Sequence, residues 1–338
     1  MLVRVGWLWG LGMMTAWGNT GPERVLFVGN SYTAFSGPDS LEASYAQLLA
    51  ERSSSETEAV VSKHTVGGAT LSMHLESAQN GALKSVLEEG WDIVVLQDQS
   101  QIPGFPKSNA EWRASRDAAV ELARLAESVG AETRLFVTWG REQGDSQNAE
   151  RYADYSTMQQ LLIQGYQAYA DAIEEAGFSV ELVGVGEVWQ SIHDAIASEG
   201  INPAEGDTLF TRLYLNDGSH PSPAGTYLAA TSFYAALTGD SPVGLVWAHQ
   251  GITEEDRNAI QLASAGLLPD EPVEPDPEEL PEDTAETGNG DAQPDLESAS
   301  CGCQTTDAPG SLGWMCGVLM LAALGSRRTA GSTRRAGQ

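Results

Sequence analysis

The chain has 338 residues, of which 41% are hydrophobic, so it is long enough to bury a substantial core. Its 47 acidic residues outnumber 18 Lys and Arg, which gives a net charge of −29. Such a charge repels phosphate backbones and anionic membrane surfaces, and we therefore expect no nucleic-acid partner. The three cysteines, Cys301, Cys303 and Cys316, all lie near the C-terminus, so we expect neither a disulfide nor a thiolate metal site in the part of the chain before them.

The first eighteen residues have the pattern of a secretory signal peptide. One early positive charge, Arg4, precedes an apolar run rich in Trp, Leu and Met, and the run ends in the small-x-small sequence Ala16-Trp17-Gly18. The run has no amphipathic period, which favours a signal over a buried N-terminal helix. The sequence therefore predicts a signal peptide over residues 1–18 and export of the remainder of the chain.

Residues 19–266 read as one domain of alternating strands and helices. Short β-branched runs ended by Gly or polar turns predict strands over residues 24–29, 57–62, 91–96, 133–138 and 179–184. Longer segments rich in Ala, Leu, Glu and Gln predict helices over residues 40–52, 71–89, 109–129, 155–176, 222–237 and 253–265. Most strands are near-continuous apolar runs, as a parallel sheet covered on both faces requires. The prediction is an α/β fold, a three-layer α/β/α sandwich with a five-stranded parallel, flavodoxin-like sheet and its active site at the carboxyl ends of the strands.

A serine comes directly after the first predicted strand. Ser31 lies in Gly29-Asn30-Ser31-Tyr32-Thr33, at the opening of a turn where a nucleophile would be presented, although the same residues would also suit a plain strand-ending turn. A serine hydroxyl is a weak nucleophile at neutral pH and needs a neighbouring base. Among the five histidines, only His220 lies in a turn with a carboxylate three residues before it, Asp217. We therefore expect His220 to act as the base for Ser31, with Asp217 fixing its tautomer and stabilising the imidazolium.

Four segments in this order make the chain similar to the SGNH (GDSL-like) hydrolases, over roughly residues 24–238. Gly29 to Thr33 resembles the first block of that superfamily, with Asn30 where the commoner form has Asp, and Asp217-x-x-His220 matches the last block. Val66-Gly67-Gly68-Ala69-Thr70 resembles the second block. The resemblance implies a serine esterase whose oxyanion hole includes the backbone N–H groups of Ser31 and Gly68.

The third block departs from the usual pattern of Gly-x-Asn-Asp. The sequence after the third predicted strand is Gln97-Asp98-Gln99-Ser100, which is closer to the Gln-containing form of carbohydrate acetylesterase relatives. A glutamine amide can donate to an oxyanion as an asparagine amide does. The resemblance implies that Gln97 is the third donor, with Gln99 as the alternative.

Four further residues are candidates for substrate binding near this edge of the sheet. They are Asn30, His64 at the end of the second strand, and Trp139 and Arg141 after the fourth strand. An aromatic face can stack on a sugar ring and Arg can bind a carboxylate, although Trp139 could equally be packed in the core. No histidine pair has the spacing of a metal site, and the first βα turn lacks a nucleotide-binding glycine pattern, so neither a metal nor a cofactor is expected.

The end of the chain has two distinct compositions. Residues 267–300 are rich in Asp, Glu and Pro and contain no Lys or Arg, which predicts a disordered acidic linker. Residues 301–338 contain Cys301-Gly302-Cys303, an apolar run over 312–325 and then arginines, and they resemble the MYXO-CTERM sorting tail of exported myxobacterial proteins. The run is shorter than a usual membrane-spanning helix. The resemblance implies contact with export and sorting machinery and a secreted or cell-surface, outer-membrane-associated location in a Gram-negative, myxobacterial-type bacterium, with membrane attachment through the tail as one form of that association.

The function that these features favour is hydrolysis of a short acyl ester, acetyl in the first place, on a small-molecule or polysaccharide carbohydrate, through an acyl-enzyme on Ser31. Two alternatives stay open, because a fold of this kind does not fix a function. One is a catalytically silent surface module that binds glycans, and the other is a lipolytic esterase.

Overall fold

The computed structural model describes residues 24–34, 40–52 and 59–268. Every described residue belongs to one compact unit. The predicted signal peptide over 1–18, the predicted linker from residue 269 onwards and the predicted tail over 301–338 lie outside the described residues. Within the described ranges, no helix is both long and apolar enough to cross a membrane.

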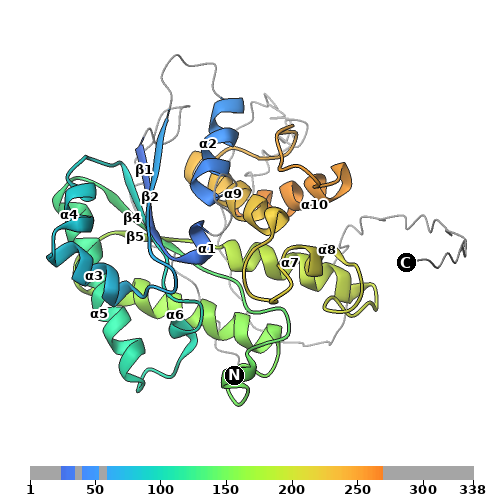
Figure 1. Ribbon diagram of the computed structural model, residues 1–338, viewed down its shortest axis with the longest axis horizontal. Helices are drawn as coiled ribbons and strands as arrows, with labels where there is room; N and C mark the ends of the chain where they lie inside the picture. Colours follow the sequence, from blue (N-terminus) through green and yellow to red (C-terminus); the bar gives the residue numbers. More distant parts are fainter. Residues whose placement is uncertain (1–23, 35–39, 53–58, 269–338) are drawn as a thin grey trace, which may run out of the picture. The chain divides into compact units, whose positions relative to one another are not determined.

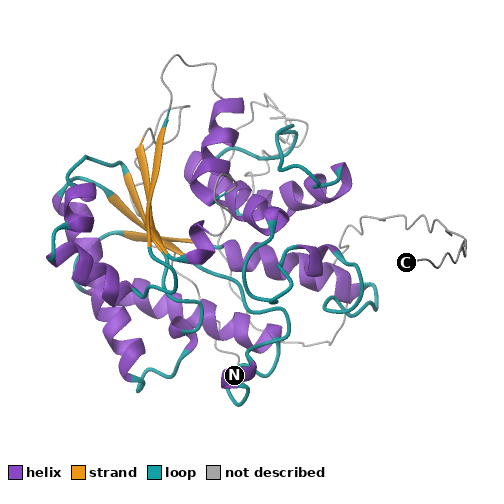
Figure 2. Ribbon diagram, in the orientation of Figure 1, coloured by secondary structure: helices purple, strands orange, loops and turns teal. Residues whose placement is uncertain are grey.

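Five parallel strands form a single sheet in the order β2-β1-β3-β4-β5. The strands are β1 (Arg24–Gly29), β2 (Val60–Thr65), β3 (Ile93–Leu96), β4 (Glu132–Phe136) and β5 (Val180–Val183). Helices cover both faces of this sheet (Figures 1 and 2), which confirms the predicted three-layer α/β/α architecture and its flavodoxin-like strand order.

Strand β1 shows why the molecule has two cores. Successive side chains of a strand point to opposite faces of the sheet. Val25 and Phe27 accordingly pack into one core, and Leu26 and Val28 pack into the other. All four side chains are buried, because β1 lies in the interior of the sheet with a layer of helices on each side.

The helices divide between these two cores. The first core takes side chains from α2 (Leu41–Arg52), α7 (Val185–Ser198), α8 (Leu209–Arg212), α9 (Pro223–Thr238) and α10 (Glu254–Ala265). The second takes them from α3 (Leu71–Gln79), α4 (Ala82–Leu87), α5 (Ala110–Ser128) and α6 (Tyr155–Glu175). Three short helical turns, α1 (Ser31–Ala34), η2 (Ile102–Gly104) and η3 (Ser146–Asn148), complete the described elements.

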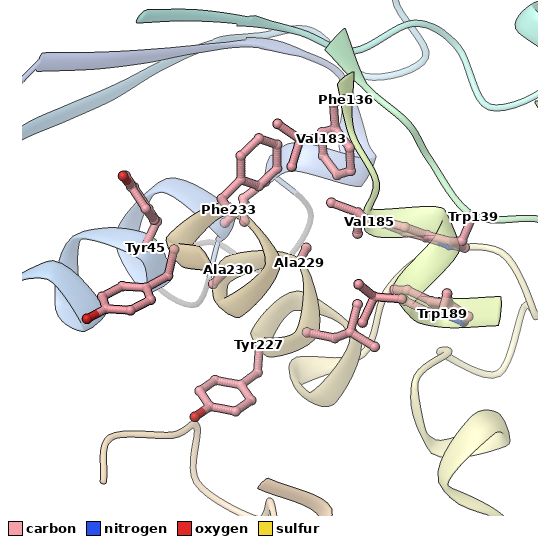
Figure 3. Close-up of a cluster of buried hydrophobic side chains, with 14 of the residues drawn as sticks. Tyr45, Phe136, Trp139, Val183, Val185, Trp189, Tyr227, Ala229, Ala230 and Phe233 are labelled. Atoms are coloured by element: carbon pink, nitrogen blue, oxygen red, sulfur yellow. The ribbon is translucent and has the colours of Figure 1, made fainter. Parts of the chain in front are cut away.

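Helix α9 is the centre of the first core (Figure 3). It is apolar on nearly all sides, which is the composition of a helix with no face toward water. Phe233 packs edge-on against Phe27 of β1 and Phe136 of β4, with ring centroids 5.0 Å apart in each pair. Because α9 begins three residues after His220, its packing against the sheet also fixes the segment that carries this histidine.

The predicted elements agree with the observed bounds to within two residues, apart from two. The second strand begins at Val60, three residues later than predicted, because it is an edge strand whose polar Ser62, Lys63 and His64 do not show an apolar run. The predicted helix over 71–89 is broken at Gly81, which adopts a left-handed conformation with φ +98° and separates α3 from α4. Helix α7 corresponds to no predicted element.

Candidate active site

The turn after β1 presents the Ser31 hydroxyl beyond the carboxyl end of the sheet. Ser31 opens the short helix α1, whose first turn is closed by the N–H groups of Thr33 and Ala34 donating to the Asn30 carbonyl at 3.1 Å. The Asn30 side chain accepts the N–H of Tyr32 at 3.0 Å. Gly29 leaves no room for a side chain, because an added Cβ would lie 2.5 Å from Gln97 Oε1 and 2.6 Å from Thr33 Oγ1. The turn is therefore tight and packs directly against the Gln97 side chain.

Asp217 and His220 lie in a turn that leads into α9. Leu215 N–H donates to the His220 carbonyl at 2.9 Å, and Gly218 reverses the chain with φ +63°. Asp217 Oδ1 accepts the N–H groups of Ser219 and His220, both at 2.9 Å. The carboxylate thus organises the turn that carries its own histidine, which explains why Asp and His are separated by two residues.

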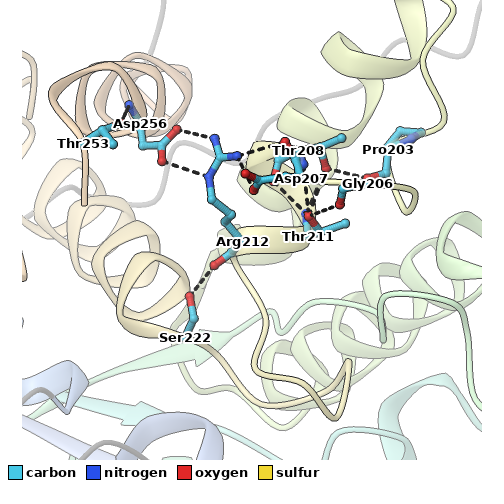
Figure 4. Close-up of polar contacts among 9 residues, drawn as sticks. All are labelled: Pro203, Gly206, Asp207, Thr208, Thr211, Arg212, Ser222, Thr253 and Asp256. Carbon is cyan, nitrogen blue, oxygen red and sulfur yellow. Dashed lines mark hydrogen bonds and ion pairs between the residues drawn. The ribbon is translucent and has the colours of Figure 1, made fainter. Parts of the chain in front are cut away.

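Polar contacts on both sides hold this segment in place (Figure 4). Ser222 caps the N-terminus of α9, and its hydroxyl donates to the Arg212 carbonyl at 2.5 Å. The Arg212 guanidinium donates to both carboxylate oxygens of Asp256 on α10, at 3.0 and 2.7 Å, and to Asp207 at 2.8 Å. The turn of Asp217 and His220 is therefore tied to α8, α9 and α10 by bidentate and capping interactions.

The structure brings Ser31, His220 and Asp217 together, although 186 to 189 residues separate the serine from the other two. Ser31 Oγ lies 2.9 Å from His220 Nε2, and His220 Nδ1 lies 2.6 Å from Asp217 Oδ2. With the Nδ1–H tautomer facing the carboxylate, Nε2 accepts the serine hydroxyl proton, which is the arrangement of an activated nucleophile. Partial burial acts to raise the pKa of Asp217, but hydrogen bonds from the His220 side chain and from two backbone N–H groups outweigh it and lower that pKa.

A stack of aromatic side chains packs against the turn that carries Asp217 and His220. The Tyr32 ring stacks on Trp139 with centroids 4.6 Å apart, and Trp139 stacks on Trp189 at 4.2 Å. Trp139 Nε1 donates to the Ser219 carbonyl at 3.0 Å, and the Tyr32 hydroxyl lies 2.7 Å from Ser219 Oγ. Trp139 is fully buried, so of the two places considered for it, the rim and the core, the structure has it in the core, beneath the turn of Asp217 and His220.

The two backbone N–H groups predicted for an oxyanion hole, those of Ser31 and Gly68, have no partner within the described residues. Gly68 is exposed and has φ +68°, a conformation that favours glycine. The loop that carries it is tied to the nucleophile turn, because Asn30 Nδ2 donates to the Ala69 carbonyl at 3.0 Å. Asn30 is itself buried, and its side chain links these two segments.

The two glutamines after β3 occupy different environments. Gln97 is fully buried; its Oε1 accepts the Asn30 N–H at 2.9 Å and the Thr33 hydroxyl at 3.1 Å, and its Nε2 donates to the Asp98 carbonyl. Both polar atoms of that side chain are therefore engaged beneath the nucleophile turn. Gln99 is partly exposed, and within the described residues its side chain bonds only to Gln101: Oε1 accepts the Gln101 N–H at 2.8 Å, and Nε2 donates to Gln101 Oε1 at 3.2 Å. The amide that remains near the surface is that of Gln99.

A polar cavity of about 630 Å³ adjoins the acid end of the triad. Its wall includes Asp217, Asn216, Arg141, Glu142 and Tyr152. Arg141 shares this wall with Asp217, and its guanidinium pairs with the buried carboxylate of Asp145 at 2.6 Å. Partial burial raises the pKa of Glu142, whose backbone N–H donates to the Gly218 carbonyl at 2.9 Å.

His64 lies on the edge strand and faces helix α3. Its Nε2 lies 3.2 Å from Ser77 Oγ, and its ring meets that of His74 edge-on at 5.7 Å. His74 is buried and its Nε2–H donates to the Gly29 carbonyl at 2.9 Å; burial lowers the pKa of His74 to about 4. Within the described residues, no group of three or more His, Cys, Asp or Glu side chains could hold a metal ion.

Sequence reasoning missed three residues of this region: Tyr32, His74 and Asp98. Each makes contacts with residues that are distant in sequence: Tyr32 with Ser219, His74 with Gly29, and Asp98 with Tyr169. Asp98 and His74 are polar side chains next to apolar or helical runs, and a buried polar group is a signal of function only once its burial is known. Burial of this kind is visible only in the folded chain.

Comparisons with known proteins support the fold. No protein-family model and no curated protein matches the chain. Among solved structures, it is similar to a DUF4886 family protein from Bacteroides uniformis ATCC 8492, with 18% identity, a TM-score of 0.56, and 72% of this chain and 93% of that chain covered. It also matches a candidate SGNH hydrolase from Slackia heliotrinireducens, with 27% identity, a TM-score of 0.46, and 64% of this chain and 98% of that chain covered. A third match is a catalytic mutant of an acetylxylan esterase from Geobacillus stearothermophilus, with 15% identity, a TM-score of 0.45, and 66% of this chain and 97% of that chain covered. The chain shares its α/β fold with the Bacteroides protein.

Proposed function

We propose that this chain is a serine esterase that hydrolyses short acyl esters, acetyl on carbohydrate in the first place, through an acyl-enzyme on Ser31. The observation that carries the proposal is the continuous chain of contacts from Ser31 Oγ to His220 Nε2 and from His220 Nδ1 to Asp217 Oδ2. A silent binding module has no need of a serine, an imidazole and a carboxylate in hydrogen-bonding sequence.

The three triad residues would divide the reaction between them. His220 Nε2 takes the proton of Ser31 as Oγ attacks the ester carbonyl, and it returns that proton to the leaving alcohol. Asp217 holds the imidazole and stabilises its charged form. Water, deprotonated by the same histidine, then attacks the acyl-enzyme, releases the acid and restores Ser31.

The oxyanion would be held by the N–H groups of Ser31 and Gly68, with the amide of Gln99 as the third donor. The alternative Gln97 is less suited, because its side chain is fully buried, whereas that of Gln99 is partly exposed. One such side-chain donor is typically worth about 3 kcal/mol of transition-state stabilisation.

The substrate class is inferred from the cavity beside the triad. Arg141, Glu142 and Asn216 line it, together with Tyr152. These groups offer hydrogen bonds to hydroxyls on the alcohol side of an ester, as a sugar would present them, and they would leave a long acyl chain poorly matched. We further propose, from the signal-like residues 1–18 and the tail over 301–338, that the enzyme is exported and held at the cell surface; fractionation of cells that express the full chain, with N-terminal sequencing, tests this.

The activity is tested by assaying the full chain against p-nitrophenyl acetate, butyrate and octanoate and against acetylated xylan, with Ser31→Ala as the matched inactive variant. We expect acetyl esters to be preferred and the variant to lose all but background turnover. Preference for octanoate would favour a lipolytic enzyme. Well-folded protein without turnover, or turnover that Ser31→Ala retains, would contradict the proposal.

A further inference from the structure

Asp98 is a buried carboxylate at the junction of all three segments that build the proposed oxyanion hole. It lies just after β3, and its exposed fraction is 0%. Its Oδ1 accepts the N–H of Leu71 at 3.0 Å, the N–H of Gln99 at 2.8 Å and the hydroxyl of Ser115 at 3.1 Å. Its Oδ2 accepts the Tyr169 hydroxyl at 3.1 Å.

The backbone of the same residue reaches the nucleophile turn. The Asp98 carbonyl accepts Asn30 Nδ2 at 3.3 Å and also the side-chain amide of Gln97. Asn30 in turn bonds the Ala69 carbonyl. One residue thereby connects the turn of Ser31, the loop of Gly68 and the chain around Gln99.

We infer that Asp98 is a positioning residue that holds the Gly68 loop and Gln99 in register with Ser31, so that the oxyanion donors converge on one point. This inference rests on the proposed esterase function. Leu71 lies three residues after Gly68 and opens helix α3, so the carboxylate fixes the end of the loop at a helix N-terminus, where negative charge is favoured. The Gln99 N–H is fixed by the same oxygen.

Stability gives no reason for a carboxylate at this position. Every partner that the structure gives Asp98 is uncharged, and burial raises the pKa of Asp98 to about 6 against the opposing effect of its hydrogen bonds. A buried charge without a cationic partner is costly to the fold. The contacts of its Oδ1 with the backbone of Leu71 and Gln99 point instead to a role in positioning these two segments.

The test compares Asp98→Ala with Asp98→Asn in the full chain. Asparagine keeps an oxygen in the place of Oδ1 and can donate its amide to the Tyr169 hydroxyl, so it preserves both backbone contacts, whereas alanine removes them. The readouts are kcat and KM for p-nitrophenyl acetate and the rate of Ser31 phosphorylation by diethyl p-nitrophenyl phosphate, which also needs the oxyanion hole. The matched control is Glu187→Gln, a buried carboxyl on α7 that touches none of these segments and whose Oε2 has no hydrogen-bond partner within the described residues.

We expect Asp98→Ala to lower kcat and the phosphorylation rate about 100-fold with KM changed by less than about threefold, because small displacements of catalytic donors cost this much. Asp98→Asn and Glu187→Gln should stay within about threefold of the wild type. Folded Asp98→Ala with wild-type rates, or Asp98→Asn as slow as Asp98→Ala, would overturn this inference and leave the proposed function standing.

Two further outcomes are decisive. If Asp98→Ala does not fold, the double variant Ser115→Ala, Tyr169→Phe frees the carboxylate from two of its four donors; rates lowered about tenfold support the inference, and unchanged rates overturn it. Wild-type protein that neither hydrolyses the ester nor reacts with the phosphate overturns the proposed function, and this inference with it.

Discussion

Replacing Asp98 by asparagine should change how the stability of the fold depends on pH. Burial raises the pKa of Asp98 from 3.8 to about 6. The folded protein therefore holds a proton between these values that the unfolded chain releases, and the stabilisation present below pH 3.8 is lost as the pH rises through 6. A shift of about two units corresponds to about 3 kcal/mol. Asparagine does not titrate, so Asp98→Asn should gain about 3 kcal/mol on the wild type between about pH 4 and about pH 7.

The assay is urea unfolding of both proteins at several pH values across this window, with the free energies of unfolding subtracted. Other groups titrate here, among them His74, whose pKa burial lowers to about 4, but they are common to both proteins and cancel in the difference. Tyr166 and Tyr169, which face Asp98 from α6, have pKa values raised by burial and stay neutral throughout. Glu187→Gln is the positive control, because burial raises the pKa of Glu187 to about 7, and it should show a gain of the same sign. A difference that stays constant within about 1 kcal/mol from about pH 4 to about pH 7 would refute the reasoning.

Three further substitutions test the site. Gly68→Ala should lower the free energy of unfolding by about 1–2 kcal/mol and lower kcat, because φ at that position is left-handed. Gly67→Ala is the control: a Cβ would meet no atom at either glycine, and this variant should be near neutral. Urea unfolding and kcat measured on both variants show whether the left-handed φ matters. Gly29→Ala should destabilise by about 1–3 kcal/mol, since the new Cβ meets the buried Gln97 amide, and an unchanged unfolding midpoint would count against the tight turn. Gln99→Ala should lower kcat about 100-fold without loss of stability, whereas Gln97→Ala should act chiefly by destabilising the fold; equal effects of the two would remove the basis for choosing Gln99.

The sheet was predictable because its interior strands are short apolar runs with clear ends. Residues 93–96 read Ile-Val-Val-Leu and are buried on both faces, so composition alone marks them as a central parallel strand. The edge strand β2 reads Val-Val-Ser-Lys-His-Thr. Because its second half is polar, an apolar run does not mark its last three residues as strand. Helix α7 was missed although Val185, Val188, Trp189 and Ile192 recur at helical spacing, because it begins directly after β5 without a polar turn to mark its start.

The site was predictable where chemistry is local in sequence and less so where it depends on packing. Asp217 and His220 share one turn, and Ser31 ends a strand, so their types and places could be read directly. Which glutamine faces the surface depends on the direction of each side chain after β3, and the pattern placed Gln97 first although the structure buries it. Trp139 likewise follows a strand in the sequence. Only the folded structure shows that it stacks between Tyr32 and Trp189 and packs beneath the turn of His220.

The most direct test of the account is whether Ser31 becomes acylated. The full chain would be mixed with p-nitrophenyl acetate, quenched in acid within the first turnover, digested, and analysed by mass spectrometry. We expect one acetyl group on the peptide that contains Ser31 and none in Ser31→Ala. An acetyl group on another residue, or unmodified Ser31 in protein that turns over the ester, would contradict the assignment of the nucleophile.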